Sequence, residues 1–236
     1  MTTSVQNLKN VLGSDAVPIA IGFLDAPPPG LERWQGGAVA AGCVFWEKAM
    51  SGQCFYTVPA DHHNCAVGSH THGFALPPER AHELTDTLGF MANSDYVAMA
   101  EVPAIPTLAT PPAVVAYGAL ERASFKPDVV LVALRPAQAM LLYEAAIKAN
   151  AGGAMMQALG RPACAVLPLT TSAGQASISL GCKGNRTFAG LADEQLYVSI
   201  PGEKWQAVVD TLLVAGHANA KMGDYYRARK ERFAAS

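Results

Sequence analysis

Short apolar runs separated by Gly- and Pro-rich turns constrain the fold of this chain more than any other feature. These runs have the length of buried β-strands, and several segments between them carry apolar residues at helical spacing. Strands and helices do not follow one another in strict strand–helix–strand order. The sequence therefore predicts an α+β fold, a single mixed α/β domain over residues 1–236 with a mostly antiparallel or mixed sheet flanked by helices. The expected strands cover residues 16–24, 53–58, 113–120, 129–134, 164–169, 176–180 and 196–200.

The expected helices lie between these strands and at both ends of the chain. The clearest covers residues 135–150, because Pro136 lies in its first turn and Asn150 is followed by two glycines. A Gly-Gly-Ala tripeptide precedes both Cys43 and Cys164, which would fit pseudo-duplicated halves of about residues 1–110 and 111–236. The other expected helices cover residues 4–12, the second half of 34–50, a segment near residue 65, 78–93 and 205–217, with a final segment at 223–233.

The composition narrows the possible partners. The chain is 50% hydrophobic and 15% charged, with 17 basic and 19 acidic residues. The one basic cluster, Arg227-Ala-Arg-Lys-Glu-Arg, is expected to close a final helix, so we expect no nucleic-acid partner. Without an apolar run of roughly 18 to 20 residues we expect no membrane partner. No signal-peptide pattern opens the sequence, so we expect a cytoplasmic protein with reduced thiols. So few charges also favour burial of some surface in a homo-oligomer.

A polar segment from Asp61 to Phe74 contains four of the six histidines and one of the five cysteines. Imidazole and thiolate are good ligands for borderline and soft metals, so the segment predicts a metal or metal-cluster site. It matches no closed signature such as Cys-x-x-Cys or His-Glu-x-x-His. We assign the candidate catalytic role to His62, His63, His70 and His72.

Four cysteines in Gly-, Ala- or Pro-rich settings form the second candidate set: Cys43, Cys65, Cys164 and Cys182. Single cysteines from separate loops can converge on one iron–sulfur cluster, where nearby glycines let backbone N–H groups approach the sulfurs. Gly181 would serve that purpose, and the Arg186 guanidinium would offset the negative charge of a cluster. For Cys54, on an expected strand, a ligand role and a core role both stay open.

Several blocks together resemble an uncharacterised family, the one catalogued as domain of unknown function 169. They are Val17-Pro-Ile-Ala-Ile-Gly-Phe-Leu, Cys65-Ala-Val-Gly, Phe125-Lys-Pro-Asp-Val-Val-Leu-Val and Ile178-Ser-Leu-Gly-Cys-Lys-Gly-Asn-Arg. The resemblance implies a single fold and cysteines at the positions of Cys43, Cys65, Cys164 and Cys182, and with them a metal or iron–sulfur role. Asn185 stands where some members have another cysteine, and the run from His62 to His72 looks unusual for the family.

Three functions follow from these residues. The leading one is a cytoplasmic iron–sulfur protein, with a 4Fe-4S cluster and a redox or lyase-type role on a small molecule or with a redox partner. The first alternative is a mononuclear zinc or iron enzyme that uses Cys65 and the neighbouring histidines. The second is a non-enzymatic protein that binds a metal or a small ligand. Dinucleotide, Walker and serine-nucleophile motifs are absent from the sequence.

Overall fold

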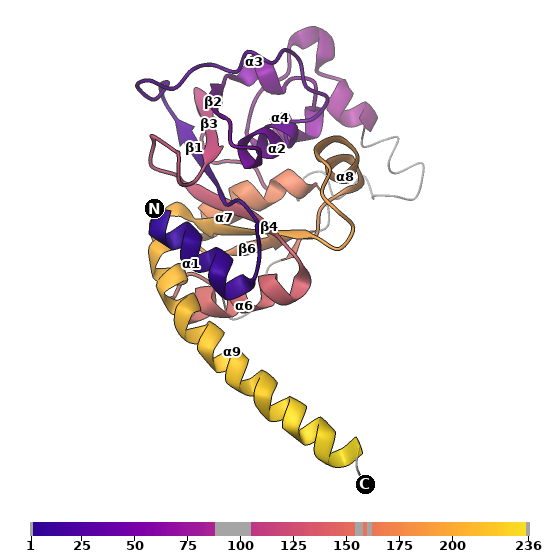
Figure 1. Cartoon of the computed structure of the whole chain (residues 1–236). Helices are drawn as coiled ribbons and strands as arrows, with labels where there is room; N and C mark the ends of the chain where they lie inside the picture. The colour runs from indigo at the N-terminus through magenta and orange to yellow at the C-terminus, as the bar shows by residue number, and fades with distance from the viewer. Residues whose placement is uncertain (1, 88–104, 154–157, 160–161, 235–236) are drawn as a thin grey trace.

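A computed structural model describes residues 2–87, 105–153, 158–159 and 162–234 of the chain (Figure 1). In these residues one sheet has the strand order β2-β3-β1-β4-β7-β6-β5. Neighbouring strands are antiparallel from β2 through to β6, and the two-residue β5 adds a parallel partner at the edge. The predicted α+β class and the mixed sheet are confirmed. The strands are β1 (Ile19–Leu24), β2 (Cys54–Thr57), β3 (Val114–Ala119), β4 (Val129–Leu134), β5 (Ala158–Leu159), β6 (Ser177–Ser179) and β7 (Leu196–Pro201).

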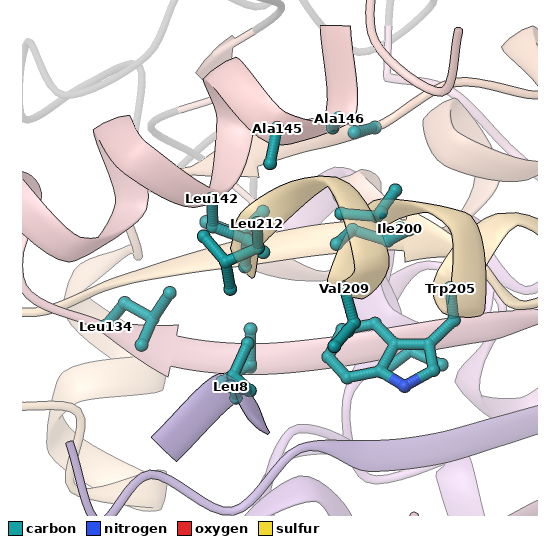
Figure 2. Packing of buried hydrophobic residues seen from close by; sticks show 14 of the residues in the cluster. Leu8, Leu134, Leu142, Ala145, Ala146, Ile200, Trp205, Val209 and Leu212 are labelled. Carbon is teal, nitrogen blue, oxygen red and sulfur yellow. The ribbon is translucent and has the colours of Figure 1, made fainter. Parts of the chain in front are cut away.

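One face of the sheet is covered by α1 (Thr2–Leu12), α6 (Pro136–Lys148) and the start of α9 (Trp205–Ala234) (Figure 1). Leu8, Leu142 and Leu212 come from these three helices and pack together against the sheet (Figure 2). Strand alternation turns every second residue towards them, such as Ile200 of β7. This face forms an apolar core, which we call the first core.

The opposite face carries the second core and a set of short helices (Figure 1). Phe45 and Trp46 of α2 pack here with Tyr117 of β3 and Tyr197 of β7. Each aromatic side chain is buried. The helices on this face are α2 (Val44–Met50), α3 (Pro59–His62), α4 (Ala66–Thr71), α7 (Val166–Ala173) and α8 (Lys183–Ala189).

One predicted strand is wrong. Residues 164–169 begin in the 3₁₀ turn η3 (Ala163–Ala165) and continue as α7, whereas each of the other six predicted strands overlaps an observed one. A short apolar run fits a buried strand and a buried helix equally well. Pro168 lies in the first turn of α7, where a missing N–H costs nothing, and Gly174 ends the helix at φ 58°.

The end of the chain also differs from expectation. The two segments predicted at 205–217 and 223–233 form one helix, α9, which runs through Gly223 and projects away from the body (Figure 1). The helix predicted at 78–93 is seen as the 3₁₀ turn η1 (Pro78–Arg80) and helical residues 83–87, and 88–93 lie outside the described residues. None of the described helices is long and apolar enough to cross a membrane.

Candidate metal centre

The four candidate cysteines lie together on the second-core side of the sheet. The Cys43 side chain belongs to that core, and the other three pack against it. Their electrostatic interactions link them: Cys65 and Cys182 act on Cys43, and all three act on Cys164. Segments separated by more than a hundred residues of sequence thus bring four thiols to one place.

Cys65 and Cys182 share one local geometry. Each residue is extended and directly precedes a short helix, Cys65 before α4 and Cys182 before α8. The Cys65 sulfur accepts the N–H of Gly68 at 3.3 Å, and the Cys182 sulfur accepts the N–H of Asn185 at 3.4 Å. Such N–H donors surround metal-bound thiolates and fix their orientation.

Burial dominates the acid–base properties of the other two thiols. It raises the pKa of Cys43 to about 12, although a hydrogen bond with the Asn185 side chain opposes the shift. Burial, and then the nearby Cys65, raise the pKa of Cys164 well above its ordinary value. Both groups are therefore protonated thiols near neutral pH, and a bound metal would displace their protons.

The Asn185 amide oxygen, beside the cysteines, is buried and has no hydrogen-bond partner among the described residues. The Asn185 amide nitrogen donates to the Tyr197 hydroxyl at 3.4 Å. Tyr117 is also buried: burial, and then Cys164, raise its pKa, and a hydrogen bond with the Thr57 side chain opposes the shift. An unsatisfied buried group is costly, so the Asn185 oxygen fits a site that receives a further group.

His62 is 1% exposed and held in one orientation. Its Nε2 lies 2.8 Å from the Thr57 hydroxyl, which donates its own proton to the carbonyl oxygen of Val115 at 3.3 Å. Because that hydroxyl has only one proton, a tautomer with the imidazole proton at Nε2 would satisfy both contacts and leave a lone pair at Nδ1. This Nδ1 is buried without a partner among the described residues, next to Gly42, where a Cβ would lie 3.2 Å away.

His72 repeats the arrangement with the opposite ring nitrogen. Its Nδ1 donates to the carbonyl oxygen of Gly68 at 2.8 Å, and its buried Nε2 has no partner among the described residues. The two imidazole centroids lie 5.0 Å apart, and the Phe74 ring packs against both. Burial lowers the pKa of both histidines, and His72 further lowers that of His62. We call His62 and His72 the imidazole pair.

The structure separates the other two candidate histidines from this pair. His63 and His70 are both half-buried, whereas the imidazole pair is buried. The neighbouring carboxylate of Asp61 caps α3 by accepting the N–H of Val58 at 2.9 Å, and it pairs with Arg33 at 3.1 Å. It is therefore committed to holding α3 in place.

Gly181 and Arg186 hold the loop around Cys182. Gly181 has φ +77°, in the left-handed region that suits glycine, and a Cβ there would lie 2.6 Å from the Leu191 side chain. The Arg186 guanidinium donates to the carbonyl oxygens of Leu180, Leu191, Ala192 and Gln195. Most N–H groups of the Arg186 guanidinium thus bind backbone carbonyl oxygens. The positive charge of Arg186 also lowers the pKa of Tyr197, against the larger opposite effect of burial.

Cys54 lies apart from the four. Strand alternation puts it on the same side of β2 as Tyr56, which packs against the first core. Its sulfur contacts the carbonyl oxygen of Arg122 at 3.9 Å. Cys54 is therefore a natural control for the others.

The described residues contain no ready-made site for one metal ion. The part of the chain that the structure describes has no group of three or more His, Cys, Asp or Glu side chains placed to hold one. The ligands of one tetrahedral ion must lie about 2 Å from a common centre, whereas each thiolate of a cluster binds a different iron. The cluster role of the four thiols stays a prediction.

Comparison with known proteins agrees with the sequence blocks described above. The model of the family known as domain of unknown function 169, described as uncharacterised ArCR, matches residues 7–211. The chain belongs to this family. Within curated proteins it is similar to the uncharacterized protein MJ0308 of Methanocaldococcus jannaschii, with 30% identity over 161 residues, or 64% of this chain and 67% of that protein. No solved structure matches the chain.

The sequence did not assign a role at the site to four polar residues: Thr57, Tyr117, Asn185 and Tyr197. Asn185 could have been assigned one, because it lies in the Gly181–Arg186 block and replaces a cysteine of some family members. Thr57 and Tyr117 lie on predicted strands, where a hydroxyl in an apolar run is a weak signal. Only the packing of α2, α3 and α4 on the sheet shows which strand residues face the cysteines.

Proposed function

We propose that this protein holds an iron–sulfur cluster, of the four-iron type, through Cys43, Cys65, Cys164 and Cys182. The observation that carries the proposal is the convergence of these thiols from separate segments on one buried face. Bound there, a cluster would supply electron transfer or a Lewis-acidic iron. The function that follows is redox or lyase-type chemistry on a small molecule or with a redox partner.

The residues around the thiols suit such a centre. Asn185 contacts Cys43 through its side chain and Cys182 through its backbone N–H. Donors of this kind stabilise metal-bound sulfur and tune its potential. The Arg186 charge lies in α8, the helix that Cys182 precedes, and would partly balance a negatively charged cluster. Exclusion of water by Phe45 and Phe74 keeps these interactions strong.

The imidazole pair would serve as ligands to the cluster or to a group held beside it. The Gly68 carbonyl oxygen accepts the N–H of His72, so its Nε2 offers a lone pair, and His62 would offer Nδ1 in the tautomer with its proton on the Thr57 side. Their lowered pKa values keep both rings neutral at neutral pH and make them weak bases, which suits binding better than proton uptake. His63 and His70 would take only a supporting part, at the edge of the site.

Anaerobic reconstitution with iron and sulfide tests the proposal. We expect visible thiolate-to-iron absorbance in the wild-type protein and its loss in Cys65→Ser and Cys182→Ser, whose side chains are half-buried. Cys54→Ser is the matched control and should keep the absorbance, because its sulfur lies with the first core. Circular dichroism of each variant separates loss of a ligand from loss of the fold. Equal absorbance in all three variants would refute the assignment.

A second candidate is a mononuclear zinc or iron enzyme built on Cys65 and the imidazole pair. The two unpartnered ring nitrogens favour it, since metal-binding histidines also give their other N–H to a carbonyl or hydroxyl. Incubation with zinc or iron alone tests this function. One tightly held ion per chain, lost in His72→Gln and retained in Cys182→Ser, would support it over the cluster.

A further inference from the structure

The body of the protein leaves the second half of α9 uncovered. The buried residues of the helix end at Leu212, and beyond Gly216 every described residue except Gly223 is exposed. The family model also stops at residue 211. Residues 213–234 span about 33 Å at 1.5 Å per residue. Figure 1 shows this segment, the projecting helix, extending beyond the sheet and its helices.

The projecting helix has an apolar stripe of its own. Its apolar members share one face of the helix, and Arg229 lies on that same face between the last two of them. They are Ala215, Ala218, Met222, Tyr225, Tyr226 and Phe233. Met222 is 49% exposed and Phe233 is 65% exposed. The stripe is rotated about a quarter turn from the face through which Trp205 and Leu212 enter the first core. It is therefore a separate contact face rather than a continuation of the core-facing one.

Size and charge along the stripe identify the partner as a second copy. Small residues, Ala215 and Ala218, lie near the body, and large ones, Tyr226 and Phe233, lie near the tip. Two such helices fill each other's space when they run antiparallel, since small residues then face large ones. A parallel pair would leave gaps at one end and crowd the other.

The charges favour the same orientation. Residues 213–236 carry five basic and two acidic side chains, while residues 1–212 carry twelve basic and seventeen acidic ones. The body therefore has a net charge of −5, and most of the positive charge lies near the tip, at Arg227, Arg229, Lys230 and Arg232. Antiparallel packing places each basic tip against the acidic body of the other copy, whereas a parallel pair would bring two basic tips together.

We propose that this protein forms a two-fold symmetric dimer in which the projecting helices of two copies pack antiparallel through this stripe. The contact is isologous, so every residue of the stripe is used twice. Covering the stripe also explains how a helical segment without other support persists, since isolated helices are marginal in water. This interface is independent of the cysteine site.

A pair of matched variants of the full chain tests the dimer by light scattering across a dilution series. Ala218→Lys places an ammonium group on the stripe, where antiparallel packing sets it against the basic tip of the other copy, and Ala220→Lys places the same group on the opposite side of the same exposed turn. We expect the wild type and Ala220→Lys to be dimers, and Ala218→Lys to dissociate at about a hundredfold higher concentration because it brings like charges together. A monomeric wild type, or equal behaviour of the two variants, would overturn the proposal.

Two further experiments test the antiparallel orientation of the helices and the identity of the partner as a second copy. Antiparallel packing holds the two copies of residue 233 far apart, so Phe233→Cys should form no more disulfide-linked dimer than the wild type under mild oxidation. Efficient cross-linking at this position would indicate a parallel pair and overturn the orientation. A monomer that binds vesicles of anionic lipid through the basic tip would replace the second copy by a membrane surface and overturn the proposal.

Discussion

The imidazole pair makes the stability of this protein fall in mild acid. His62 is 1% exposed and His72 is 3% exposed, and burial lowers the pKa of both. In the unfolded chain both would protonate near the ordinary value of 6.5, whereas in the fold they stay neutral. The unfolded state thus binds more protons below that value, and the free energy of unfolding decreases as the pH falls.

The size of this effect follows from the number of groups. Each buried neutral imidazole contributes a slope of at most about 1.4 kcal/mol per pH unit between its unfolded pKa and its lower folded pKa. Between about pH 7.5 and about pH 5.5 the two together reduce the free energy of unfolding by at most roughly 3 kcal/mol. Urea denaturation of the metal-free protein at several pH values measures the slope directly.

Variants assign the slope to the pair. His72→Gln should remove about half of the pH dependence, while His217→Gln, on the exposed part of α9, should leave it unchanged. If His72→Gln folds too weakly for urea denaturation, NMR titration of the wild-type imidazoles gives the same answer. Two buried rings that titrate at or above 6.5, or a slope that His72→Gln leaves intact, would refute this description of the pair.

Three further outcomes follow from the described contacts. Gly181→Ala meets both a φ of +77° and the Leu191 side chain, so it should lower the melting temperature and the stability by about 1 to 3 kcal/mol, and impair cluster retention. Arg186→Lys cannot reproduce the contacts with the carbonyl oxygens of Leu180 and Gln195, so limited proteolysis should cut residues 180–195 faster than in the wild type. Leu142→Ala, in the fully buried first core, should lose about 2 to 5 kcal/mol in urea denaturation while cluster content per folded chain stays unchanged.

Most of the fold follows from local sequence patterns. Pro136 at the start of α6 and the apolar runs of β3 and β4 identify those elements without tertiary information. Residues 164–169 show the limit, because an apolar run of that length is compatible with two structures until its neighbours are known. In the sheet, β4 and β7 each have an antiparallel strand on both sides, so no position beside them is open for a further strand. Residues 166–169 instead form part of α7, which packs on the second-core face.

The candidate site is harder to predict, because its geometry depends on long-range packing. Cysteine spacing alone cannot distinguish Cys54 from Cys43, since both lie in apolar surroundings; only the alternation of β2 separates them. In the same way, the sequence does not show which histidines are buried. The helical turns of α3 and α4 bury His62 and His72 and leave His63 and His70 half-buried. The ligand role of the four cysteines stays a prediction, as does the possible duplication of the chain.

Analysis of iron and acid-labile sulfide in protein purified without oxygen tests the central claim most directly. A cluster held by Cys43, Cys65, Cys164 and Cys182 predicts about four irons and about four sulfides per chain. The Cys54→Ser variant should give the same ratio, and Cys65→Ser should lose both elements together. A single metal ion without sulfide would contradict the cluster and favour a mononuclear site at Cys65 and the imidazole pair. Protein that binds neither iron nor sulfide after reconstitution would also contradict the claim.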